Sequence, residues 1–236
     1  MRYLLPTLCT LLALHAQEEW ELYHAPGADT AALAEQVQPK LPPGAALKLQ
    51  ALPPTHSTPS ELRLHARAMA AGVSELPSLV LRDAQGAYAS MPLNRLTPEA
   101  TEQLRRQAAE AEHSEAARYR VCMAQLYLLC ALLDLTTEPS DRERITARMH
   151  ELMQAPDTPE NARQFIGMHG LYPTLMQQYA EGYQGAHTPR TEAKLLEAIG
   201  VLEAVRDMNP TSHLGRVAYD EREKLRAARL RSRQYE

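Results

Sequence analysis

The chain changes its hydrophobic pattern near residue 110. Before this point, short apolar runs alternate with segments of helical periodicity, whereas the later segments all have helical periodicity. Short strands mixed with separate helices are typical of an α+β fold, and 236 residues are enough for two modest domains. We therefore expect an α+β domain at residues 17–110 and an all-α helical domain at residues 111–236.

The first domain is expected to have the element order βαβα, followed by a β-hairpin and a final helix. In the second strand, Leu47, Leu49 and Ala51 alternate with polar residues, as in a strand with one buried face. Asp29 and Thr58 stand where each can cap a helix. The expected strands are 19–24, 46–52, 79–81 and 87–91, and the expected helices are 30–37, 59–71 and one that opens at Thr97-Pro98.

Most of the later helices are expected to begin at a capping hydroxyl residue. Thr58, Thr97, Thr158 and Thr188 each precede a proline, which suits the first helical position. Further candidate caps are Ser114, Ser140, Thr211 and Ser212. The expected helices cover 97–135 (as one helix, or as two that separate near Ser114), 139–154, 158–169, 173–183, 188–208 and a last one toward Tyr235.

Residues 18–110 resemble the thioredoxin-like fold in their order of elements. The segment Glu75–Leu81 resembles that family's loop before its third strand, where the proline is cis, and 83–86 resembles the hairpin turn that follows. The resemblance implies a cis Leu76-Pro77 bond. A different small α+β domain is the alternative.

The same family carries a Cys-x-x-Cys motif at the start of its first helix, where the helix dipole lowers the thiol pKa. Tyr23–Asp29 resembles the approach to that motif, but Ala28 and Ala31 occupy the two cysteine positions. Alanine carries no nucleophile, so dithiol exchange is chemically unavailable at this site.

Without the two cysteines, the resemblance still implies a helix N-terminus that lies beside a loop with a cis proline. Such a pair can hold an extended peptide or an anion through backbone groups. The candidate peptide- or anion-binding residues are Pro26, Gly27, Ala28, Asp29, Leu76 and Pro77. The alternative is that this segment binds nothing and only completes the fold.

The segment Glu197–Pro210 resembles the second helix of a tetratricopeptide repeat. Only one copy is recognisable, whereas stable arrays need several repeats. We therefore expect stacked helical hairpins without assigning the repeat family.

The N-terminus is typical of a secretory signal peptide that ends at Ala16. Arg2 precedes an apolar run from Leu4 to Leu14, so we expect a periplasmic or secreted protein. The alternatives are a buried first element and a lipid anchor at Cys9. Residues 1–16 hold one arginine and no acid, so their removal changes the formal net charge from -4 to -5 and gives no reason to expect nucleic-acid binding.

The apolar run Val121–Leu133 is too short for a bilayer span, and we expect it to be a buried helix with no transmembrane segment in the mature chain. Cys122 and Cys130 lie eight residues apart on this helix, a rise of about 12 Å that is too long for a disulfide. Each is expected to be a small buried residue. An intermolecular disulfide or a reactive thiol is the alternative.

The sequence motifs indicate no catalytic residue, metal site or cofactor. The chain has no P-loop, nucleophile elbow, dinucleotide fingerprint or His-Glu-x-x-His motif. His24, Asp29, His56 and His65 lack ligand spacing. Residues of the type that bind copper, namely Met149, His150, Met153, Met168 and His169, lie on expected helices, where methionine is usually core filler.

These observations favour an exported, redox-inactive thioredoxin-like protein whose helical domain serves protein interaction or scaffolding. Its partner would be a protein or peptide of unknown identity. Whether the chain is an enzyme stays open, with a non-catalytic protein favoured. The alternatives are an enzyme of unrecognised type, with a site between the domains around His24, Asp29 and His56, and a periplasmic copper-handling protein.

Overall fold

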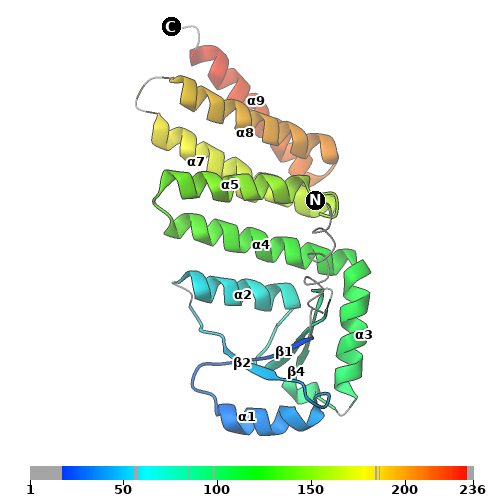
Figure 1. Cartoon of the computed structure of the whole chain (residues 1–236). Coiled ribbons are helices and arrows are strands. Elements are labelled where there is room, and N and C mark those ends of the chain that lie inside the picture. Colours follow the sequence, from blue (N-terminus) through cyan, green and yellow to red (C-terminus); the bar gives the residue numbers. More distant parts are fainter. Residues whose placement is uncertain are drawn as a thin grey trace, which may run out of the picture. The chain divides into compact units, whose positions relative to one another are not determined.

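A computed structural model of the chain describes residues 18–55, 58–84, 86–97, 99–183, 185 and 187–232 (Figure 1). The expected signal peptide, residues 1–16, lies outside the described residues. Contacts between residues separate the chain into two compact units, and the boundary falls between Arg120 and Val121. The fold is α+β, because a mixed sheet in the first unit is followed by helices.

The first unit contains a four-stranded sheet of order β2-β1-β3-β4. The strands are β1 (Glu19–His24), β2 (Leu47–Ala51), β3 (Ser78–Arg82) and β4 (Tyr88–Pro92). Strand β1 pairs in parallel with β2 and antiparallel with β3, which pairs antiparallel with β4. A parallel pair needs a crossover connection, and α1 (Thr30–Val37) with the short helix η1 (Gln38–Lys40) supplies it. The expected strands and hairpin are confirmed.

Helices cover both faces of this sheet, with α1 and α2 (Pro59–Ala71) on opposite sides (Figure 1). One face carries Trp20 and Leu22, which pair with Leu81 and Leu79, and packs against α1, η2 (Leu93–Arg95) and α3 (Ala100–His113). The other face carries Tyr23 and Val80 and packs against the alanines of α2. Strand β1 is therefore buried on both faces, as its position at the centre of the sheet requires.

The α2 side of the sheet contains a buried carboxylate. Glu21 is only 5% exposed in its side chain, and Arg67 Nη1 of α2 lies 3.3 Å from Glu21 Oε1. The phenol of Tyr23 donates a hydrogen bond of 2.7 Å to Glu21 Oε2. Glu21 therefore has both the countercharge and the hydrogen-bond donor that a buried carboxylate needs.

The second unit consists of helices, all at or close to the expected positions. They are α4 (Glu115–Leu135, which begins in the first unit), α5 (Pro139–Gln154), α6 (Glu160–Ile166), the π-helix η3 (Gly167–Leu171), α7 (Tyr172–Gly182), α8 (Pro189–Met208) and α9 (His213–Ser232). Helix α8 packs against both α7 and α9, so successive helices are neighbours in space (Figure 1).

Four of the expected helix starts are confirmed by their hydrogen bonds. Thr58 and Thr188 each accept from the backbone of the third helical residue and form a capping box. The hydroxyl of Ser212 accepts from the Gly215 amide at 2.9 Å. Ser114 separates α3 from α4, and its hydroxyl accepts from the third residue of α4.

Three other expected caps are wrong. Helix α3 begins at Ala100, whose amide donates to the Thr97 carbonyl in a preceding turn, so Thr97 lies before the helix. Ser140 is already inside α5, which begins at Pro139. The hydroxyl of Thr158 donates to the Leu152 carbonyl at the end of α5 (2.8 Å), and α6 has no side-chain cap.

Helix α6 continues through η3 into α7, where separate helices ending near 169 and starting at Pro173 were expected. Pro173 has no amide hydrogen, and its ring would collide with a carbonyl one turn earlier in a regular helix. The wider π-turn just before it avoids that collision. Gln164 then binds the end of α8, since its Nε2 donates to the carbonyls of Val205 and Asn209.

Helix α4 is long and apolar enough, by length and composition alone, to cross a membrane, and it is the one such helix among the described residues. Buried positions account for 28% of its most apolar stretch. Both of its cysteines are free, Cys122 being buried and Cys130 half-buried. Burial, followed by the nearby Asp134, raises the pKa of the Cys130 thiol, which disfavours the reactive thiolate.

We predict that Gly167→Ala destabilises the second unit by about 1–3 kcal/mol. A Cβ at Gly167 would overlap Cγ2 of Val205, which is fully buried and β-branched, and would lie 3.2 Å from Cε of Met153. Urea unfolding followed by far-ultraviolet circular dichroism measures the change.

The control is Gly200→Ala on α8, where no heavy atom lies within 4 Å of the added Cβ. It should stabilise by up to about 1 kcal/mol through helix propensity alone. Equal effects of the two substitutions would contradict the packing argument.

We also predict that the first unit loses stability above pH 10 through Tyr23. Burial, followed by the hydrogen bond to Glu21, raises the pKa of Tyr23 above its ordinary value. The neutral Tyr23 phenol therefore contributes fully to the free energy of unfolding below pH about 10. This contribution is lost as pH rises from there toward the pKa that Tyr23 has in the folded state. Above pH 10, wild type should lose up to about 1.4 kcal/mol per pH unit more than Tyr23→Phe.

Fluorescence of Trp20 during urea unfolding is the measurement, because Trp20 is the only tryptophan and lies on the same strand. Parallel pH profiles for the wild type and Tyr23→Phe would exclude Tyr23 as the titrating group.

Candidate functional site

A tight turn connects the buried strand β1 to α1. The amide of Ala28 donates to the Ala25 carbonyl (3.3 Å), with Pro26 and Gly27 at the two central positions. Gly27 has φ of 81°, which a type II turn requires at its third residue and which glycine adopts without a Cβ clash. Pro26 and Gly27 therefore shape the turn that presents Ala28.

Asp29 caps α1, as expected from the sequence. One oxygen of its carboxylate, Oδ1, accepts from the amides of Ala31 and Ala32, at 3.1 Å each. These are donors that an external anion would use at a helix start. Because Asp29 already occupies them with a negative charge, this helix start is poorly suited to an anion.

The loop opposite this turn contains the cis Leu76-Pro77 bond. Pro77 is held by the next elements, since its carbonyl accepts from the Leu93 amide at 2.9 Å. The hydroxyl of Ser78 donates to the Glu75 carbonyl at 2.7 Å. Within the part of the chain that the structure describes, Leu76 makes no hydrogen bond through its amide or carbonyl, so both groups are free to pair with a ligand.

The turn and the loop line one groove of about 270 Å³. It is bounded by four of the six candidate residues together with residues of β1 and α1: His24, Ala25, Ala28, Asp29, Ala32, Leu33, Gln36, Leu76 and Pro77. Ala28 and Leu76-Pro77 thus border the same groove. Pro26 and Gly27, the other two candidates, are not part of its lining.

A second hollow of about 290 Å³ adjoins the groove. The two share Leu33, Gln36, Leu76 and Pro77, and the second continues to Leu93 and its neighbours in the segment 92–94. Together they form an elongated surface that is mostly apolar, with the short side chains of Ala28 and Ala32 leaving room along one wall.

Ala32 and Gln36 were absent from the sequence-based site although their spacing could have found them. They follow Ala28 at four-residue intervals, which puts all three on one side of the helix and its first turn. Leu93 and Asn94 carry no such signal, because only the folded hairpin brings their segment to Pro77.

The groove has little catalytic chemistry. It contains no thiol, because the first unit has no cysteine after Cys9. His24 is 5% exposed, and its Nδ1 lies 2.9 Å from the Ala25 carbonyl, which can only accept, so Nδ1 carries the proton. Asp29 is used as a cap. A base without a neighbouring nucleophile does not define an active site.

The other residues that were considered as metal ligands, and set aside, are dispersed. Nε2 of His65 lies 2.8 Å from the Pro53 carbonyl, away from the groove lining, and His56 falls outside the described residues. Met149 and Met153 are buried in the second unit, and His150 Nε2 lies 2.9 Å from Glu197 Oε1. Among the residues the structure describes, no three His, Cys, Asp or Glu side chains converge as a metal site.

Comparison with known protein families, curated proteins and solved structures found no match to this chain.

We predict that Gly27→Ala lowers the stability of the first unit by about 1–2 kcal/mol. No heavy atom lies within 4 Å of the added Cβ, so the positive φ is the only source of the cost. Gly27→Asn should lose less, because asparagine tolerates this backbone region. Unfolding is measured by Trp20 fluorescence. A larger loss in the asparagine variant would contradict the turn assignment.

Proposed function

We propose that the first unit is a thioredoxin-like domain that has lost dithiol chemistry and binds an extended peptide. The element order βαβα-ββ-α and the cis Leu76-Pro77 bond support the fold assignment. Alanines at positions 28 and 31 remove the thiols that the family uses for exchange. The chain as a whole would then act in protein interaction or scaffolding, with export directed by residues 1–16.

The observation that carries this proposal is the unpaired backbone of Leu76 at the wall of an apolar groove. A bound strand pairs its own amides and carbonyls with such groups, and adjacent apolar pockets receive its side chains. The groove offers both a backbone partner and apolar surface, since Leu76 is 37% exposed and Ala28, Ala32 and Leu33 line the same groove.

A peptide is favoured over an anion as the ligand because the backbone amides at the start of α1 already have an acceptor. The carboxylate of Asp29 takes the amides of Ala31 and Ala32, so an anion would have to displace a covalently attached competitor of the same charge. An extended peptide requires no such exchange, because it would pair with Leu76 on the other side of the groove.

The helical unit fits the same role through its stacked helices. Helices α7, α8 and α9 pack in succession, and the segment of tetratricopeptide-like sequence lies on α8 and the residues that follow it. Stacked helical pairs are a common support for protein binding. The proposal therefore assigns binding roles to both units and catalysis to neither.

The proposal is tested with an array of 15-residue peptides of mixed apolar and polar sequence, followed by titration of the best binders. We predict that Ala32→Trp weakens binding at least roughly tenfold, because its side chain fills the groove at the level expected for a central contact. Fluorescence anisotropy of labelled peptides gives the dissociation constants.

Ala31→Trp is the matched control. Ala31 is the adjacent, exposed residue of the same helix and does not line the groove, so this variant should bind like the wild type. Absence of binders in the array, or equal affinities for the Ala32→Trp and wild-type proteins, would refute the proposal.

A further inference from the structure

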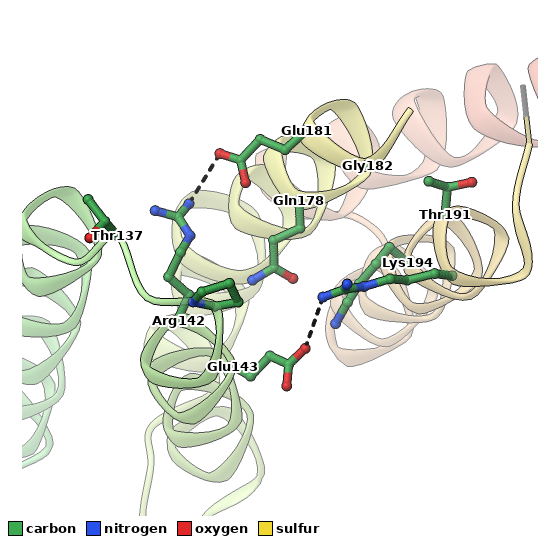
Figure 2. Close-up of a pocket in the computed structure, with 10 residues that line it drawn as sticks. Thr137, Arg142, Glu143, Gln178, Glu181, Gly182, Thr191 and Lys194 are labelled. Atoms are coloured by element: carbon green, nitrogen blue, oxygen red, sulfur yellow. Dashed lines mark hydrogen bonds and ion pairs between the residues drawn. The ribbon is translucent and has the colours of Figure 1, made fainter. Parts of the chain in front are cut away.

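The second unit contains a pocket, lined mainly by polar residues, that no motif or spacing in the sequence predicts. It has a volume of about 220 Å³ and lies where the start of α5, the end of α7 and the start of α8 meet (Figure 2). The side chains that define its chemistry are Arg142, Glu143, Gln178, Glu181, Arg190 and Lys194. They come from three helices, yet all lie within one compact unit.

Unpaired hydrogen-bonding groups concentrate at this pocket. Within the described part of the chain, four buried side-chain nitrogen or oxygen atoms make no hydrogen bond. Three of them are Nε and Nη2 of Arg142 and Oε1 of Gln178, and both residues line the pocket. Buried polar groups without a hydrogen bond are rare because each costs about 1–3 kcal/mol, so three at one pocket mark a place where a polar ligand gains hydrogen bonds.

Both side chains are held in place at their other ends. Nη1 of Arg142 donates to the carbonyls of Leu133 and Thr136 at the end of α4, at 3.3 and 3.2 Å. Nε2 of Gln178 donates to the hydroxyl of Thr146 at 3.1 Å. The unpaired edges therefore have fixed positions, as a preorganised binding site requires.

The ion pairs across the pocket are long. Nη2 of Arg142 lies 3.5 Å from Glu181 Oε1, and Nη2 of Arg190 lies 3.5 Å from Glu143 Oε1 (Figure 2). Good charge-assisted hydrogen bonds are about 2.7–2.9 Å, so these pairs are loose. The shorter contact of Glu181 Oε1 is with Nε2 of Gln177, which donates to it at 2.8 Å on the exposed side of α7. Because the side chain of Glu181 is 53% exposed, it can turn into solvent with Gln177 and leave the Nε–Nη2 edge of Arg142 to another carboxylate.

The charges at the pocket are balanced. Arg142 and Arg190 face Glu181 and Glu143, and Lys194 is bonded to Glu197 at 3.2 Å. A polyanion would meet these carboxylates and gain little. A ligand that carries both a carboxylate and an amino group matches the free donors of Arg142 and the free acceptor of Gln178 at the same time.

We propose that this pocket binds a free α-amino acid. The ligand carboxylate takes the Nε–Nη2 edge of Arg142 in place of Glu181, and its ammonium group donates to Oε1 of Gln178 with Glu143 nearby. The volume of about 220 Å³ is below the range of roughly 300–1,000 Å³ that is usual for larger ligands, which favours a molecule of this size. This site is independent of the peptide groove in the first unit.

Isothermal titration of the full chain with glycine, alanine, glutamine and glutamate tests the proposal. At least one amino acid should bind, and succinate, ethanolamine and inorganic phosphate should each bind at least roughly tenfold more weakly, because succinate lacks the amino group, ethanolamine lacks the carboxylate and phosphate lacks both. Failure of all four amino acids to bind overturns the proposal. The proposal is equally overturned if succinate, ethanolamine or phosphate binds as tightly as the best amino acid.

Variants locate the binding. Gln178→Leu and Glu143→Ala should each weaken it at least roughly tenfold, because each removes a group that faces the ligand ammonium. Glu143 is 58% exposed, so its removal leaves the fold intact even if Gln178→Leu unfolds. Arg144→Ala is the control, since Arg144 is 79% exposed on the same α5 and lies outside the pocket lining. Wild-type affinity in Glu143→Ala overturns the assignment.

Discussion

The architecture of the first unit depends on the burial of β1 on both of its faces and both of its edges. Its pairing with β2 is parallel, so the chain must cross over through α1, and its pairing with β3 is antiparallel, which leaves the β3–β4 hairpin beside it. Helix α1 follows the end of β1 and α2 follows the end of β2, at the same edge of the sheet, because the two strands are parallel. The groove forms at that edge because the Ala25–Ala28 turn and the Leu76-Pro77 loop both lie next to β1.

Local sequence patterns were enough to predict the bounds of an element where those bounds depend on residues close together in the chain. Strand β1 and helices α1, α2, α5 and α8 begin and end at the expected residues because alternation, helical periodicity and proline act within a few residues. The threonine–proline pairs show where local patterns fail to predict the role of a residue. Thr58 and Thr188 cap their helices, whereas the hydroxyl of Thr158 donates to Leu152 at the end of the preceding helix, a choice that depends on how α5 and α6 pack.

The two sites also differ in whether the sequence or only the packing of the fold could reveal them. Ala28, Asp29, Leu76 and Pro77 were found because a family resemblance joined two segments that lie about fifty residues apart in the sequence. The pocket in the second unit had no such guide. Arg142, Gln178 and Arg190 are ordinary helix-surface residues in the sequence, and only the packing of α5, α7 and α8 makes their polar groups converge.

The two sites differ in how their polar groups are satisfied, and this difference determines what each can recognise. At the groove, the helix start is neutralised by Asp29 and the walls are apolar, so recognition must come from shape and from the Leu76 backbone, which every peptide sequence can pair with. At the pocket, fixed donors and a fixed acceptor stay unpaired, so a ligand without the matching groups would leave them buried and unsatisfied. A site of the first kind tolerates many partners, whereas a site of the second kind discriminates among small molecules. On the two proposals made above, the groove of the first unit holds a variable protein partner, and the pocket of the second unit holds a defined small molecule.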